Sequence, residues 1–100
     1  MGTIRALLVG VCEYIKVKCP SLPLCKNDLF AMSSALVQGL NVNSDNIFLC
    51  GETGTVTKLE LVASIHTVLE DATDDDTFIF YFSGHGGKNC LVLSDSLGLV

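Results

Sequence analysis

Charge is scarce in this chain, and positive charge is scarcer still. Lysine and arginine contribute six of the 100 residues against eleven aspartates and glutamates, so the formal net charge is -5. Because proteins that bind nucleic acids usually present a basic face, we do not expect a nucleic-acid partner. Apolar residues form 49% of the sequence, which is too large a share for a disordered segment and is typical of a globular interior.

Long hydrophobic runs and regularly spaced cysteines are also missing. No apolar run reaches the roughly 18 residues of a membrane-spanning helix. No small-residue cleavage site follows the N-terminal apolar run, so we expect neither a membrane partner nor a signal peptide. The five cysteines are odd in number and form no C-x-x-C pair, which argues against a disulfide framework and a structural metal site. Reduced thiols in a cytoplasmic protein are the simplest interpretation.

The apolar residues follow a strand–helix–strand–helix–strand pattern. The nearly continuous apolar run of residues 4–11 predicts a parallel strand buried on both faces. A short second strand is predicted at residues 46–50, and the β-branched and aromatic residues 77–82 predict a third. Apolar residues at helical spacing predict one helix between each pair of strands, around residues 29–39 and 57–72. Residues 91–93 are apolar enough to begin a further short strand.

Polar residues mark the expected ends of the two helices. Asn27 or Asp28 is the predicted N-cap of the first helix, and Gly39 is its predicted end. Thr57 and Glu60 have the spacing of a capping box at the start of the second helix. These caps support the helical interpretation of both segments.

Two other polar features are predicted to face solvent. His66 lies beside the apolar stripe of the second helix, so we interpret it as a surface histidine. The acidic residues between Glu70 and Asp76 are interpreted as a solvated helix end and a turn. Neither feature is expected to take part in catalysis.

Two right-handed βαβ units follow from this pattern. With the helices on opposite faces, the strand order is 2-1-3 and the fold class is α/β with a mainly parallel sheet. Ligand sites in such sheets form beyond the carboxyl ends of the strands, where the chain reverses direction across the sheet. That point lies between the first and third strands, at residues 11–13 and 83–85.

A histidine stands at one of these strand ends, within the sequence FYFSGHGG of residues 80–87. Histidine titrates near neutral pH, so His85 is able both to accept and to donate a proton. The neighbouring glycines leave room for a substrate backbone, and exposed N–H groups there are able to stabilise an oxyanion. The alternative is a histidine that merely occupies a tight turn after a strand.

The segment of residues 81–87 resembles the histidine motif of the caspase/metacaspase superfamily of cysteine peptidases. Residues 5–11 are similar to the family's first strand, and residues 22–28 resemble the entry to the first helix of metacaspases. The resemblance runs from about residue 4 to about residue 95. It implies a three-layer caspase-like fold, with residues 1–100 as the N-terminal part of one catalytic domain whose sheet is incomplete on its C-terminal side.

The resemblance implies a cysteine endopeptidase with a Cys–His dyad that acts on proteins or peptides without a cofactor, and it leaves calcium dependence open. His85 would be the general base and acid, the N–H of Gly86 would help hold the oxyanion, and Ser83 would line the pocket for the P1 side chain. Caspases that cut after aspartate carry an arginine near the first-helix entry, where this chain has leucine, proline and leucine at residues 22–24. A basic P1 residue is therefore expected, with the acidic residues of the pocket coming largely from outside this chain.

The nucleophile is the main departure from the family pattern. The caspase cysteine follows the histidine by about 50 residues, which lies beyond Val100. Cys90 follows His85 too closely, and Cys12 ends the first strand, so neither fits the expected position. We therefore expect the nucleophile on a C-terminal segment or partner chain that completes the sheet. The alternative is a non-catalytic caspase-like module with a regulatory or interaction role.

Overall fold

The computed structural model of the chain describes residues 2–14, 25–87 and 90–95, apart from the side chains at positions 25, 26, 87 and 90. The elements in chain order are β1 (Ile4–Gly10), α1 (Cys25–Leu40), the 3-10 helix η1 (Ser44–Asn46), β2 (Ile47–Cys50), α2 (Lys58–Val68), β3 (Thr77–Ser83), β4 (Gly86–Gly87) and β5 (Cys90–Leu91). The three strands and two helices predicted from the sequence are all present, and a short β4–β5 hairpin follows them.

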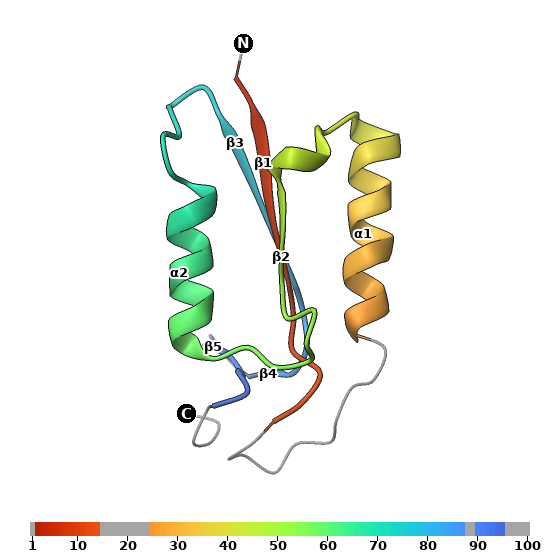
Figure 1. The fold of residues 1–100 in the computed structure, drawn as a ribbon, viewed down its shortest axis with the longest axis vertical. Helices are drawn as coiled ribbons and strands as arrows, with labels where there is room; N and C mark the ends of the chain where they lie inside the picture. The colour runs from red at the N-terminus through yellow and green to blue at the C-terminus, as the bar shows by residue number, and fades with distance from the viewer. Residues whose placement is uncertain (1, 15–24, 88–89, 96–100) are drawn as a thin grey trace.

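β1 is the central strand of a parallel sheet with the order β2-β1-β3 (Figure 1). It aligns with β3 over its whole length, from Ile4 opposite Thr77 to Gly10 opposite Ser83. The predicted α/β class and the predicted strand order are therefore confirmed. Among the described residues, β3 is paired with β1 alone, so its other side forms an edge of the sheet.

The side chains of β1 alternate between two hydrophobic clusters, as the pleat of a strand requires. Leu7 and Val9 are fully buried on one face together with Val68 of α2. Leu8 is fully buried on the other face together with Leu29 of α1. Figure 1 shows the two helices on opposite sides of the sheet. This three-layer arrangement explains why β1 is apolar on both of its faces from Ala6 to Val9.

The boundaries of α1 differ from the prediction at both ends. The helix begins at Cys25, so Asn27 and Asp28 lie inside its first turn and neither is the N-cap. At the other end the helix passes Gly39, and Asn41 adopts the left-handed conformation that follows it, with a φ of 56°. The prediction was wrong because asparagine, whose short polar side chain bonds locally, also tolerates that conformation.

The predicted start of α2 is confirmed. The Thr57 hydroxyl accepts the N–H of Glu60 at 3.2 Å, and the Glu60 carboxylate accepts the N–H of Thr57 at 3.2 Å, which is a complete capping box. The helix ends at Val68, earlier than the stripe that was predicted to continue to Ala72. His66 is exposed on the surface of this helix, as expected.

At the opposite edge of the sheet from the strand carboxyl ends, Arg5 and Asp76 tie several segments together. The Arg5 guanidinium donates to the carbonyl of Val68, the last residue of α2, at 3.2 Å, and thereby satisfies one of the helix's terminal carbonyls. The Asp76 carboxylate accepts the N–H groups of Thr3 and Thr73 at 2.9 and 3.0 Å and lies 3.5 Å from Arg5. The expectation of a purely solvated acidic run is therefore wrong for Asp76.

Asp76 is expected to make stability sensitive to acid. The hydrogen bond from Thr3, then that from Thr73 and the charge of Arg5, hold the pKa of the Asp76 carboxyl below its ordinary value of 3.8. Folding thus favours the charged form, whose contribution is fully present above the ordinary pKa and is lost as pH falls through the lowered value. We expect Asp76→Asn to lower the free energy of unfolding at pH 7 and to flatten its fall in acid, as measured by urea denaturation of the full-length protein at several pH values. Asp74→Asn, in the same acidic run, is the matched control; an unchanged acid slope in Asp76→Asn would contradict the prediction.

Candidate active site

The segments that follow the three parallel strands meet at the carboxyl edge of the sheet, the lower edge in Figure 1. The N–H of Val11 donates to the carbonyl of Ser83 at 2.9 Å, which joins the ends of β1 and β3. The N–H groups of Cys12 and Glu13 both donate to the carbonyl of Gly54, at 3.0 and 2.9 Å, which joins the end of β1 to the turn after β2. The ends of the first and third strands therefore lie together as predicted.

His85 follows β3 at this edge, is partly buried, and is held through both of its backbone polar groups. Its N–H donates to the hydroxyl of Tyr14 at 2.8 Å. Its carbonyl accepts the N–H of Val92 at 3.0 Å. The rings of Tyr14 and His85 are 5.0 Å apart between centroids and inclined at 54°. The predicted histidine is thus fixed from the β1 side and from the segment after β5.

Gly84 leaves little room for a side chain. A Cβ atom at this position would lie 3.1 Å from ring atoms of Phe82 and 3.1 Å from the hydroxyl oxygen of Tyr14. Both distances are shorter than ordinary van der Waals contacts, so any larger residue would press on the hydroxyl that binds His85. A larger residue before the histidine would therefore have to displace Phe82 or the Tyr14 hydroxyl by a few tenths of an ångström.

The β4–β5 hairpin brings the backbone of Gly86 to the site, where Gly86 pairs with Leu91. The N–H of Val92 donates to the carbonyl of His85, so His85 and Val92, the pair next to Gly86 and Leu91, occupy a hydrogen-bonded position of the ladder. Because such positions alternate along an antiparallel ladder, Gly86 and Leu91 form a non-hydrogen-bonded pair. The N–H of Gly86 therefore points away from β5, outside the hairpin ladder.

The segment after β5 is anchored by Ser94, which is fully buried. Its hydroxyl donates to the carbonyl of Glu13 at 2.7 Å and accepts the N–H of Val56 at 2.8 Å. The N–H of Ser94 in turn donates to the carbonyl of Val56 at 2.8 Å. These bonds tie the hairpin's return segment to the ends of β1 and β2, and so they also hold Val92 beside His85.

Ser83, the last residue of β3, donates a hydrogen bond from its hydroxyl to the Asp28 carboxylate at 2.8 Å. Asp28 is exposed in the first turn of α1, where the helix dipole favours a negative charge. From the sequence, Asp28 was predicted as a possible helix cap within the metacaspase-like segment, and the acidic groups of the pocket were expected to come largely from outside the chain. The sequence did carry a signal for Asp28, which lies in the metacaspase-like segment of residues 22–28. Residues 22–24 of that segment lie outside the described residues.

The two cysteines whose side chains the structure describes are buried. Cys12 and Cys50 are each 6% exposed, so a peptide substrate has little access to either sulfur. Burial raises the pKa of the Cys50 thiol, and a hydrogen bond with Ser64 offsets this only in part, which makes it a poor source of thiolate. The remaining cysteine side chains lie outside the described residues, at positions 19, 25 and 90.

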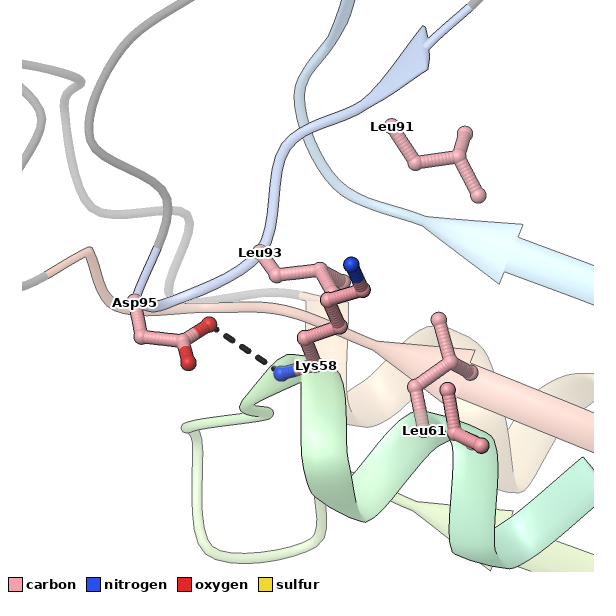
Figure 2. A pocket seen from close by; sticks show the side chains of 6 residues that line it. Lys58, Leu61, Leu91, Leu93 and Asp95 are labelled. Atoms are coloured by element: carbon pink, nitrogen blue, oxygen red, sulfur yellow. Dashed lines mark hydrogen bonds between the residues drawn. The ribbon is translucent and has the colours of Figure 1, made fainter.

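An apolar hollow separate from His85 lies between α2 and the segment after β5 (Figure 2). It is lined by Lys58, Leu61, Val62, Leu91, Leu93 and Asp95. The Asp95 carboxylate accepts the N–H of Lys58 at 3.1 Å, the dashed line in Figure 2, and so supports the first turn of α2. Neither His85 nor Ser83 lines this hollow. Its polar groups serve a structural junction, and we place the candidate site at the carboxyl edge of the sheet.

Neither a metal site nor a membrane span is found within the described ranges. No cluster of three or more histidine, cysteine, aspartate or glutamate side chains there is arranged to hold a metal ion. None of the helices in those ranges is long and apolar enough to cross a membrane.

Comparison with known proteins identifies the family. The model of the metacaspase, peptidase C14 domain matches residues 4–95. Metacaspase-1A of Aspergillus oryzae is 32% identical over 92 residues, which cover 87% of this chain and 22% of that protein. Metacaspase-1 of Schizosaccharomyces pombe is 27% identical over 92 residues, which cover 87% of this chain and 21% of that protein. No solved structure gives a significant match.

The chain therefore spans about a fifth of the length of these curated relatives. The family match covers nearly all of it, from the start of β1 to Asp95, and includes the histidine motif at the carboxyl edge of the three-layer fold. On the match to residues 4–95, this chain belongs to the metacaspase family, peptidase C14.

Proposed function

We propose that residues 1–100 form the N-terminal part of the catalytic domain of a cysteine endopeptidase, in which His85 works with a cysteine outside these residues. The observation that carries the proposal is the placement of His85 at the carboxyl end of β3, with its N–H and its carbonyl both bonded. A side chain that transfers protons in catalysis must be held in a defined position. These bonds fix the backbone of residue 85, from which the imidazole extends.

In this mechanism the imidazole of His85 accepts the thiol proton as the sulfur attacks the peptide carbonyl, and it then donates a proton to the leaving amine. The tetrahedral intermediate carries a negative oxygen that backbone N–H groups are able to stabilise. The N–H of Gly86, which points out of the hairpin ladder, supports this role. The N–H of His85 is already bonded to Tyr14, so we assign the oxyanion contact to Gly86.

For the substrate, we propose a preference for arginine or lysine at P1. The hydroxyl of Ser83 and the carboxylate of Asp28 are bonded to each other at 2.8 Å and lie at the same edge of the sheet as His85. A carboxylate at this place attracts a cationic side chain and repels an aspartate. This pair gives the basic preference implied by the family resemblance a source within the described residues.

We further propose that the strand bearing the nucleophile pairs with the open edge of β3. Phe78 and Phe80 of β3 are 39% and 42% exposed, with ring centroids 6.4 Å apart, so the edge carries apolar surface that soluble proteins normally cover. A parallel strand added there ends beside His85, because the carboxyl ends of parallel strands lie at one edge. A thiolate mechanism also requires a reduced cysteine, which suits the cytoplasmic location that we propose.

The direct test compares the full-length protein with residues 1–100 alone. We expect the full-length protein to cleave fluorogenic peptides after arginine or lysine and to lose this activity on thiol alkylation, because the acyl-enzyme forms on sulfur. Residues 1–100 alone should show no hydrolysis and should gain it when mixed with the downstream segment. Activity of the short chain that disappears in Cys12→Ala would contradict the assignment of the nucleophile. An inactive full-length protein would favour the non-catalytic module.

A further inference from the structure

We propose that Tyr14 is a positioning residue for His85: its hydroxyl holds the histidine backbone away from the β4–β5 ladder and so fixes the imidazole for proton transfer. The inference rests on the proposed function, since it concerns the turnover of the same site. Tyr14 contacts the histidine through its hydroxyl and its ring, and we assign it no contact of its own with the reacting bond. The role is carried by its two hydrogen bonds and by the contact between the two rings.

The Tyr14 hydroxyl bridges the ends of the first and third strands. It donates to the carbonyl of Val11 at 3.1 Å and accepts the N–H of His85 at 2.8 Å. A hydroxyl has one donor and two acceptor positions, so both bonds form at once and each fixes the direction of the other. The ring of Tyr14 packs against the hydrophobic cluster under α2. The bridge therefore has a rigid base at the end of β1.

The bond from His85 to Tyr14 replaces a bond that the hairpin would otherwise make. In an antiparallel ladder, the two residues of a hydrogen-bonded pair exchange both N–H···O bonds. His85 accepts from Val92, but its own N–H is directed to the Tyr14 hydroxyl. Without that hydroxyl, the carbonyl of Val92 is the natural acceptor. His85 would then rotate into the ladder and carry its imidazole with it.

The histidine side is the part that would move in such a rearrangement. Val92 lies two residues before Ser94, whose buried hydroxyl is bonded to Glu13 and Val56 at 2.7 and 2.8 Å. His85 follows Gly84, which carries no side chain that would resist rotation. Losing the Tyr14 hydroxyl should therefore displace the imidazole and leave the hairpin in place.

The test removes this hydroxyl alone in the full-length protein, with Tyr14→Phe. The matched control is Tyr81→Phe, which makes the same chemical change in β3 but on the opposite face of the sheet, where Tyr81 packs against the cluster under α1. We expect Tyr14→Phe to lower kcat on the order of ten- to a hundredfold and to leave KM within about twofold, since small misplacements of a reacting group have effects of this size. The control should match wild type in both constants.

A second readout follows the imidazole directly. In protein labelled with 13C-histidine, the ring signal of His85, assigned with His85→Gln, should shift in Tyr14→Phe and stay unchanged in Tyr81→Phe, with the exposed His66 as internal reference. An active wild type whose Tyr14→Phe variant keeps its kcat would overturn the inference about Tyr14 and leave the proposed function standing. An inactive wild type would overturn the proposed function, and the ring signal would still report whether Tyr14 positions His85. A lower thermal stability with unchanged kcat would show a merely structural role and also overturn the inference.

Discussion

Replacing His85 by alanine in the full-length protein is expected to lower kcat by roughly a thousandfold or more, because general acid–base catalysis contributes on the order of 10²–10⁴ to the rate. In the proposed mechanism one imidazole both activates the thiol and protonates the leaving amine, so its loss affects both steps. KM should change much less, since the substrate contacts proposed above belong to Ser83, Asp28 and Gly86. Steady-state hydrolysis of a fluorogenic arginyl peptide measures both constants.

This substitution is a clean test because the histidine is held by its backbone. The bonds to Tyr14 and Val92 use the N–H and carbonyl of residue 85, and alanine retains both groups. The loop should therefore keep its position, and the melting temperature should stay close to that of wild type. His66→Ala is the matched control, since His66 is exposed on α2; its kcat is expected to stay within about twofold of wild type. Unchanged turnover in His85→Ala would remove the assigned role.

Much of the fold was predictable because its causes are local in the sequence. The apolar run of β1 indicated burial on both faces, and the spacing of Thr57 and Glu60 indicated the start of α2. Once three strands and two intervening helices were recognised, right-handed βαβ crossovers gave the order 2-1-3 on the assumption that the two helices cover opposite faces of the sheet. The position of His85 at the carboxyl edge followed from that order, without knowledge of any side-chain contact.

The details of the site were not predictable because they depend on contacts between distant segments. The β4–β5 hairpin begins with two glycines, which have low strand propensity. The segment after the hairpin is held by the hydrogen bonds of Ser94 with Glu13 and Val56. A strand was expected at residues 91–93, but the observed one is Cys90–Leu91. The bond between Asp28 and Ser83 spans 55 positions and requires α1 to dock with its first turn at the carboxyl edge.

That contact leads to the prediction for substrate choice. Asp28→Asn is expected to lower kcat/KM for an arginyl P1 substrate on the order of ten- to a hundredfold, because hydrogen bonds to charged groups contribute about 1.5–3 kcal/mol. The amide of asparagine has nearly the same shape, and its oxygen is still able to accept the hydroxyl bond of Ser83. The variant therefore removes the negative charge while leaving the arrangement of the pocket largely intact.

A pair of P1 substrates separates charge from shape. Citrulline is a neutral analogue of arginine, so the ratio of kcat/KM for arginine to that for citrulline should fall in Asp28→Asn and stay unchanged in Asp45→Asn. Asp45 is a suitable control because it is also an exposed aspartate in the first turn of a short helix, η1, which precedes β2 at the other edge of the sheet. Both substitutions thus remove the charge of an exposed aspartate, and only one removes it beside Ser83. An unchanged ratio in Asp28→Asn, or a wild-type preference for aspartate at P1, would show that this carboxylate does not select the substrate.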